Sequence, residues 1–185
     1  MDNLHSNKKL KLDELYRLSS EQFKNAPKNP FVIVLDNVRS MHNVGSVFRT
    51  ADAFLVDKIY LCGITGIPPH KEINKTALGA TETVAWEYAP TTLELINNLK
   101  SDGYQIVCLE HTSESISIQK FCPKKDQKYA LIFGNEVFGV SDEVIEKANI
   151  CVEIPQFGTK HSLNISVAAG IVIWDFSNKS QITSS

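Results

Sequence analysis

Two kinds of apolar pattern alternate along most of the chain. Short, continuously apolar and β-branched runs are typical of strands buried on both faces of a sheet, and runs with apolar residues at helical spacing are typical of helices. The strand-like runs lie at residues 31–35, 58–62, 83–88, 104–109, 129–133 and 150–154. The helix-like runs lie at residues 43–54, 72–78, 91–99, 141–147 and 163–176. This alternation predicts an α/β fold with a mostly parallel sheet flanked by helices.

The two ends of the chain have patterns of their own. Residues 10–24 place apolar side chains near helical spacing, which predicts an amphipathic helix that ends at the prolines Pro27 and Pro30. Residues after Phe176 are mainly polar and predict a frayed end. We therefore expect a helical extension at residues 1–29, one domain at residues 30–176 and a flexible polar tail at residues 177–185.

Composition narrows the class of protein. The chain has 185 residues, of which 43% are apolar, so it can bury a core and is not a disordered chain. Its net charge of −2 argues against a polycation that holds nucleic acid through bulk charge, although a local basic patch stays open. The N-terminus has no apolar run, and the longest apolar stretch, residues 167–174, is too short to span a membrane. We expect a cytoplasmic protein without a membrane segment.

Three segments rich in polar residues and glycine follow predicted strands. They are residues 36–49, 132–140 and 154–166. In a parallel α/β sheet, ligands bind beyond the carboxyl ends of the strands, so these segments are the candidates for a site. The chain contains no G-x-G-x-x-G, G-K-[ST], H-E-x-x-H or G-x-S-x-G motif, and its four cysteines form no C-x-x-C pair. We therefore expect no metal site, and the missing glycine signatures count against an unrelated nucleotide-cofactor enzyme.

Each candidate side chain also has a purely structural explanation. Asn43 can cap a helix and Arg49 can form a surface ion pair, while Glu136 can cap the helix that follows it. Ser162 and Asn164 can cap the last helix. The convergence of three such segments on one edge of the sheet is what favours a functional site.

The three segments together resemble the SpoU (TrmH-like) class of the SPOUT methyltransferases, which transfer a methyl group from S-adenosylmethionine to a ribose 2′-hydroxyl of RNA. The first family motif, N-x-G-x-x-x-R, matches residues 43–49, and the second, G-N-E-x-x-G, matches residues 134–139. The third, I-P-x-x-G-x-x-x-S-L-N-x-S-x-A, matches residues 154–168. All three occur in order, and the resemblance spans residues 31–176.

The resemblance implies a deep trefoil knot in the C-terminal part of the fold and a homodimer with its active site near the subunit interface. It implies that S-adenosylmethionine lies bent in the knot, and that Arg49 has the central catalytic role. An arginine with a pKa above 12 is a poor base, so we favour a clamp on phosphate and hydroxyl oxygens over proton abstraction. By the same resemblance, four residues hold the cofactor and four more hold Arg49 and the ribose. The cofactor residues are Leu109, Gly134, Ile154 and Leu163, and the positioning residues are Asn43, Glu136, Ser162 and Asn164.

The implied partner is RNA, and the substrate class stays open. Residues 1–30 carry a net charge of +2, and Arg39, Lys71 and Lys75 follow the first two predicted strands, which favours a local phosphate track. The loop at residues 63–81 resembles tRNA-acting members of the class, so tRNA is favoured over rRNA. A non-catalytic RNA-binding or assembly module on the same fold is the alternative from a different class.

Overall fold

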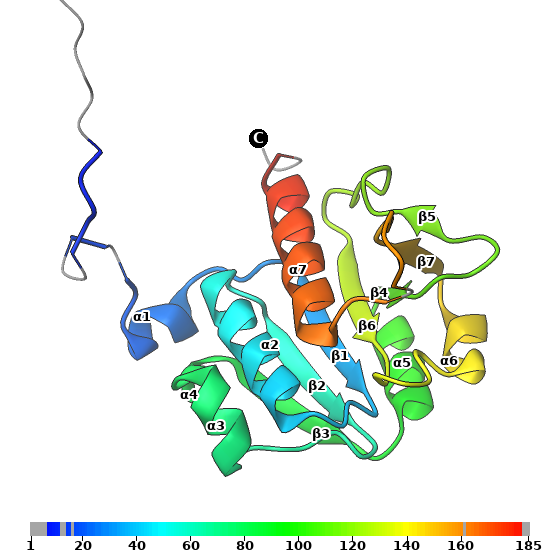
Figure 1. Ribbon diagram of the computed structural model, residues 1–185, viewed down its shortest axis with the longest axis horizontal. Coiled ribbons are helices and arrows are strands. Elements are labelled where there is room, and N and C mark those ends of the chain that lie inside the picture. Colours follow the sequence, from blue (N-terminus) through cyan, green and yellow to red (C-terminus); the bar gives the residue numbers. More distant parts are fainter. Residues whose placement is uncertain (1–6, 12–13, 16, 161, 183–185) are drawn as a thin grey trace, which may run out of the picture.

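A parallel sheet forms the centre of the molecule (Figure 1). The computed structural model describes residues 7–11, 14–15, 17–160 and 162–182, and over these ranges the sheet has seven strands in the order β3-β2-β1-β6-β4-β7-β5. The strands are β1 (Phe31–Asp36), β2 (Lys58–Cys62), β3 (Ala85–Ala89), β4 (Tyr104–Leu109), β5 (Ile116–Ser117), β6 (Lys128–Phe133) and β7 (Ile150–Glu153). Every neighbouring pair is parallel.

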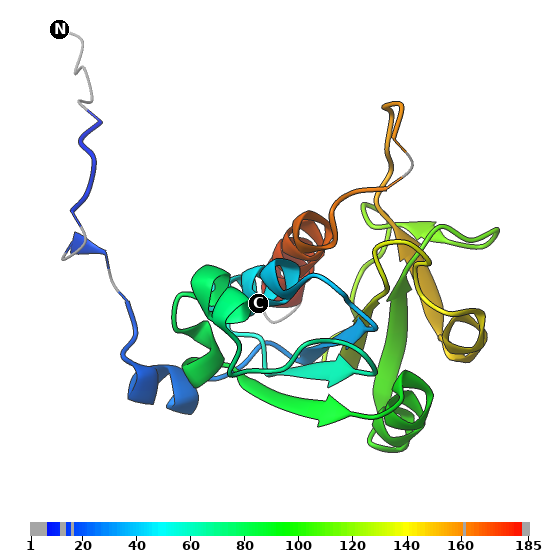
Figure 2. The same ribbon diagram turned by 60° about the horizontal axis from the view of Figure 1, so that its bottom comes forward.

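Helices cover both faces of the sheet, which confirms the predicted fold class (Figure 2). They are α1 (Ser20–Asn25), α2 (Met41–Ala53), α3 (Lys71–Ala77), α4 (Ala80–Thr83), α5 (Thr92–Ser101), α6 (Asp142–Lys147) and α7 (Ile165–Ile182). Helices α2, α3, α4 and α7 pack on one face, where Phe48, Phe133 and Phe176 are buried. Helices α5 and α6 pack on the other face, around Ile96 and Ile106.

How deeply each strand is buried follows its place in the sheet. Every residue of β1 is buried, and β6 is buried except at Lys128, because these two strands lie at the centre with helices above and below. Strand β3 is largely exposed, as expected at an edge. No helix in the described ranges has both the length and the apolar character needed to cross a membrane. The implied trefoil knot does not follow from the strand order and stays a prediction.

The helix predicted at residues 10–24 is wrong at residues 10–11, 14–15 and 17–19. In the described part of residues 10–24, the α-helix is confined to α1, where Ser19 and Gln22 form a capping box and Phe23 is the buried anchor. Leu10 and Leu18 are 57% and 52% exposed, so they contact no core that would stabilise a longer helix. Leu12 and Tyr16, which supported the prediction, lie outside the described residues.

The last helix is longer than its apolar pattern predicted. Helix α7 continues past Phe176 to Ile182, where we expected a frayed tail. Ser177 is buried and donates a hydrogen bond to the carbonyl oxygen of Ile173 at 2.7 Å. Lys179 forms an ion pair with Asp175 at 2.7 Å on the same helix. These polar contacts extend the helix beyond the residues that the apolar periodicity marks.

Candidate active site

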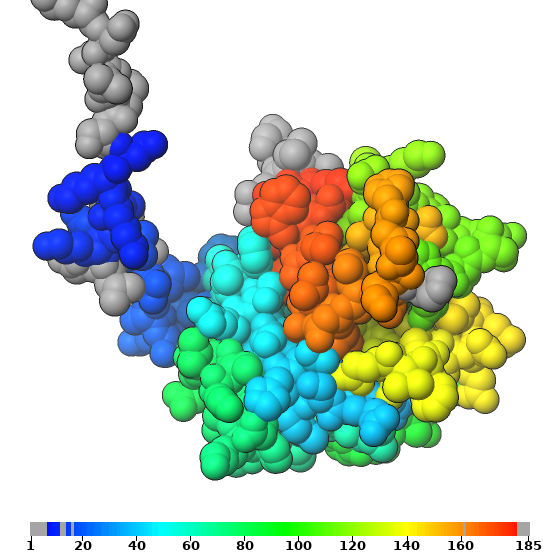
Figure 3. Space-filling model, in the orientation of Figure 1, coloured from blue at the N-terminus to red at the C-terminus, as the bar shows by residue number. Residues whose placement is uncertain are grey.

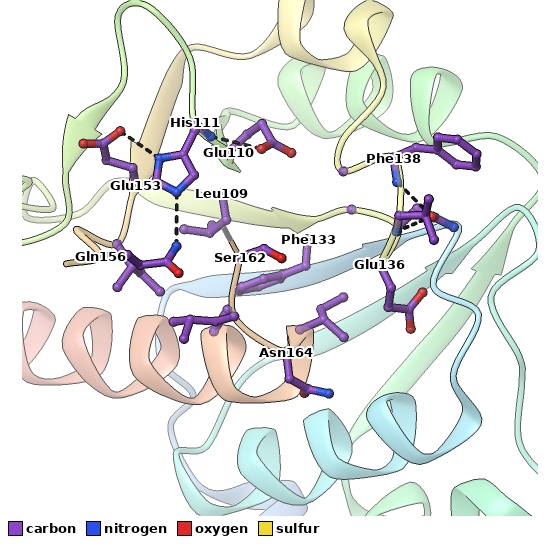
Figure 4. Close-up of a pocket in the computed structure, with 18 of the residues that line it drawn as sticks. Leu109, Glu110, His111, Phe133, Glu136, Phe138, Glu153, Gln156, Ser162 and Asn164 are labelled. Carbon is purple, nitrogen blue, oxygen red and sulfur yellow. Dashed lines mark hydrogen bonds and ion pairs between the residues drawn. The ribbon is translucent and has the colours of Figure 1, made fainter. Parts of the chain in front are cut away.

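A cavity of about 560 Å³ opens at the carboxyl ends of β4, β6 and β7 (Figure 4). The four predicted cofactor residues and three of the predicted catalytic residues line it: Leu109, Gly134, Ile154, Leu163, Glu136, Ser162 and Asn164. The segments that follow β4, β6 and β7 therefore meet at one edge of the sheet, as their polar character predicted. Within the described residues, no group of three or more His, Cys, Asp or Glu side chains is arranged to hold a metal ion.

Apolar side chains and glycine backbone both line the cavity. Leu109, Phe133, Ile154 and Leu163 contribute apolar walls from four different parts of the chain. At Gly134 a Cβ atom would lie 2.2 Å from the backbone of Gly139 and Val140, so only glycine permits this close approach. Such walls, with exposed backbone groups between them, suit a flat heteroaromatic ring.

Glu136 joins the turn after β6 to the start of α2. Its carboxylate accepts hydrogen bonds from the backbone N–H of Arg39 at 2.9 Å, the backbone N–H of Ser40 at 3.0 Å and the side-chain amide of Asn43 at 3.1 Å. It therefore does not cap the following helix α6. Asn43 is not the cap of α2 either, because that position belongs to Ser40. Both structural explanations offered for these two residues are wrong.

Asn164 continues this chain of hydrogen bonds into the third segment. Its side-chain amide donates to Oδ1 of Asn43 at 3.1 Å, and its own Oδ1 accepts from the backbone N–H of Ser166 at 2.8 Å. The capping explanation is therefore correct for Asn164, which precedes α7, but the residue also contacts Asn43. Glu136, Asn43 and Asn164 thus connect the three sequence motifs.

Arg49 is the predicted catalytic residue that neither lines the cavity nor joins the hydrogen-bonded chain of Glu136, Asn43 and Asn164. It is exposed on α2 and is not among the lining residues. It lies six residues after Asn43, which on an ideal helix is about 9 Å along the axis and about 120° around it. Among the described residues it forms no ion pair, so its surface ion-pair explanation finds no support there.

The three cations predicted to contact RNA are all exposed. The backbone N–H of Arg39 donates a hydrogen bond to the carboxylate of Glu136. Lys71 and Lys75 are one turn apart on α3, which packs against α2. Their placement beyond the carboxyl ends of β1 and β2 is as expected. Their contact with RNA stays a prediction.

A polar cluster at the other end of the cavity was missed from the sequence. Nδ1 of His111 lies 3.2 Å from a carboxylate oxygen of Glu153, and Nε2 of His111 lies 3.2 Å from the side-chain nitrogen of Gln156 (Figure 4). Hydrogen bonds from Ser115 and His111 lower the pKa of Glu153. Their positions in the sequence could have identified these two residues. His111 follows the strand at residues 104–109, and Glu153 lies next to the third motif.

Titration of the Glu136 carboxyl is expected to change the signals of the backbone amides that donate hydrogen bonds to it. Burial raises its pKa, but the hydrogen bonds from Arg39, Ser40 and Asn43 outweigh burial, so the pKa is lowered overall. A lowered pKa stabilises the native state above the unfolded carboxyl pKa of about 4.3, and this stabilisation is lost as pH falls through the folded pKa. In an NMR titration, the Glu136 carboxyl carbon and the Arg39 and Ser40 amides should share one midpoint below that value.

Glu136→Gln is the control for this titration. The amide keeps an acceptor for one backbone N–H but cannot titrate, so the Arg39 and Ser40 amide shifts should no longer change with that midpoint. If both amides titrate unchanged in the variant, another group holds them.

Comparison with known proteins identifies similar sequences and structures. The model of the SpoU rRNA Methylase family matches residues 30–174. The chain is 32% identical over 145 residues to a tRNA (guanosine(18)-2′-O)-methyltransferase of Aquifex aeolicus, covering 78% of this chain and 67% of the relative. It is 32% identical over 149 residues to the 23S rRNA (guanosine-2′-O-)-methyltransferase RlmB of Neisseria meningitidis, covering 80% of this chain and 58% of the relative.

A solved structure has the same fold. The AdoMet-bound rRNA methyltransferase from Sinorhizobium meliloti superposes with a TM-score of 0.76 at 28% identity, covering 84% of this chain and 59% of that chain. This chain therefore spans about three fifths of the length of several of the proteins it matches.

Proposed function

The chain belongs to the SpoU rRNA methylase family, and on this basis we propose that it transfers the methyl group of S-adenosylmethionine to a ribose 2′-hydroxyl of RNA. The observation that carries the proposal is the hydrogen-bonded chain from Glu136 through Asn43 to Asn164. This chain connects the three family motifs beside a cavity of suitable size. The relatives named as tRNA and rRNA 2′-O-methyltransferases support the same reaction.

The residues present fit the cofactor. Leu109, Ile154 and Leu163 offer apolar contacts for the adenine, and the backbone at Gly134 and Gly139 lines the cavity with no side chain between it and a ligand. S-adenosylmethionine, when bound, supplies the methyl group on a sulfonium that leaves as a neutral thioether. The chain then has to position the 2′-hydroxyl and help it lose its proton.

Arg49 is the proposed clamp for the reacting group. Its guanidinium stays charged and its donors match phosphate and hydroxyl oxygens, so it can orient the ribose while the proton passes to phosphate or water. Glu136, Asn43 and Asn164 fix the start of α2, the helix that carries Arg49. The acidic and amide groups thus act as positioning residues.

Arg49 is exposed outside the cavity of its own chain, which supports a dimeric site. Beside α2, helix α7 exposes Val167, Ile171 and Trp174, which share one face at helical spacing. We infer a homodimer in which this apolar face is covered by a second copy and Arg49 of one subunit serves the cavity of the other.

Mixed dimers test this arrangement. Leu163→Trp should fill the cavity, because Leu163 lines it and is 38% exposed, and Arg49→Ala removes the clamp. Each homodimer should be inactive, whereas random co-assembly should restore about a quarter of wild-type activity, because half of the dimers carry one complete site. Co-expression with two affinity tags isolates the mixed dimer. If the mixture is no more active than either parent, Arg49 does not serve the partner's cavity.

The substrate is tested by labelling. We propose tRNA, on the resemblance of the loop at residues 63–81 to tRNA-acting members, with rRNA as the alternative supported by the relative RlmB. Incubation with tritiated S-adenosylmethionine and separate pools of unmodified tRNA and rRNA should label the tRNA. Nuclease-resistant label in a dinucleotide identifies 2′-O-methylation. Label only in rRNA would correct the substrate, and no label in either pool would favour the non-catalytic RNA-binding module.

A further inference from the structure

The turn between β6 and α6 presents an aromatic ring to solvent at the edge of the cavity. Phe138 is 84% exposed although it belongs to the cavity lining, and its neighbour Val137 is 65% exposed. In Figure 4 the Phe138 ring points away from the other labelled side chains. Two exposed apolar residues in succession have no role in the core, so the fold does not explain them.

This turn is held in place without any burial of the ring. Asn135 and Gly139 exchange two backbone hydrogen bonds of 2.9 Å. Oδ1 of Asn135 also accepts the backbone N–H groups of Val137 at 2.8 Å and Phe138 at 3.1 Å, and its Nδ2 donates to the carbonyl oxygen of Asn37 at 2.8 Å. The backbone that carries Phe138 is therefore ordered before any partner binds, which lowers the entropic cost of binding.

The backbone of a cationic residue is tied to this turn by a hydrogen bond. Glu136, two residues before Phe138, accepts the backbone N–H of Arg39, whose side chain is exposed. Figure 3 shows the turn (yellow) at the surface next to the light-blue segment that leads into α2. A ring and a guanidinium on two connected turns match a nucleotide, because the base can stack on the ring and the phosphate can pair with the guanidinium.

We propose that Phe138 is a stacking platform for an unpaired base of the RNA, adjacent to the nucleotide whose ribose enters the cavity. The inference rests on the proposed function and adds a residue that selects single-stranded RNA near the target. A second copy of the chain is the other possible occupant of the ring. RNA is favoured because a subunit contact there would also bury the charge of Arg39 beside an apolar patch.

Stacking can be measured directly with a fluorescent base. The probe is a 12-residue oligouridylate that carries one 2-aminopurine, whose fluorescence is quenched when it stacks. Phe138→Ala and Phe138→Leu should weaken binding at least about fivefold and reduce the quench, because stacking requires an aromatic face. Phe138→Trp should retain both.

Tyr88→Ala is the matched control. Tyr88 is also an exposed aromatic residue, at 45%, but it lies on the edge strand β3, which β2 and β1 separate from β6, so its loss should leave RNA binding unchanged. Equal binding by Phe138→Ala and the wild type, full binding by Phe138→Leu, or an equal loss in Tyr88→Ala would overturn the stacking assignment.

Three further outcomes separate the stacking assignment from the proposed function on which it rests. If Phe138→Ala sediments as a monomer while the wild type is a dimer, the ring is a subunit contact and the stacking assignment is wrong. If the wild type methylates RNA but the Phe138 variants do so equally well, only the stacking assignment fails. If the wild type neither binds the probe nor labels any RNA, the proposed function fails as well.

Discussion

Arg49→Ala is expected to reduce methyl transfer to RNA by at least about 100-fold, the usual effect of removing a group that stabilises charge in a transition state. The affinity for S-adenosylmethionine should stay at the wild-type value, because Arg49 is not part of the cavity lining. Single-turnover labelling of RNA measures the first quantity and calorimetry measures the second. Arg49→Lys should recover only part of the activity, since an ammonium lacks the planar fork of donors.

Arg39→Ala is the matched control for this experiment. Arg39 is also an exposed arginine, but it lies at the rim and its backbone, not its side chain, bonds Glu136. Its loss should weaken RNA binding and the salt dependence of binding while leaving the single-turnover rate at saturating RNA unchanged. Wild-type turnover by Arg49→Ala would falsify the assignment of the clamp.

Gly134→Ala is expected to abolish detectable binding of S-adenosylmethionine. The new Cβ would lie 2.2 Å from backbone atoms of Gly139 and Val140, which no side-chain rotation can relieve. The turn must open, and the carboxylate of Glu136 then loses its hydrogen bond from the backbone N–H of Arg39. We expect the free energy of unfolding to fall by about 1–3 kcal/mol, as for other overpacked sites. Calorimetry and denaturant unfolding measure the two effects.

Gly158→Ala serves as the control for this substitution. Gly158 follows β7 in the third motif, but a Cβ at Gly158 would meet nothing within 4 Å. This variant should bind the cofactor and unfold like the wild type. A Gly134→Ala protein that binds normally would show that the turn can shift, and the close approach would then not be required.

The strands were predictable because their signal is local. A run such as residues 31–35 is apolar without interruption, and such a run is a strand buried on both faces wherever it pairs. The edge of the sheet that carries the site was also predictable, since the carboxyl ends of parallel strands lie at the same edge. The strand order was not predictable, because β6 pairs with β1 over a long separation in sequence and no local pattern encodes that choice.

The errors at the candidate site have two different physical origins. Asn43 and Arg49 share a motif, but helical geometry turns them to different faces, and this separation could have been calculated from their spacing alone. The contact between His111 and Glu153 spans 42 residues, so only the folded sheet brings the two together. The helix expected at residues 10–24 forms only from Ser20 in the described residues, because amphipathic spacing does not make a helix where there is no core to cover, as at Leu10 and Leu18.

The position of β6 has a consequence for how the protein is made. Strand β6 pairs with β1 on one side and β4 on the other, so until it is inserted those two strands have open edges facing each other. On the ribosome these edges stay unpaired until residue 133 has emerged. The next residues to emerge form the turn that carries Glu136 and Phe138. Closing the centre of the sheet is therefore a late event, and the pocket is completed later still, when its lining residues between 152 and 168 have emerged. A nascent chain stalled before residue 133 would be prone to aggregation.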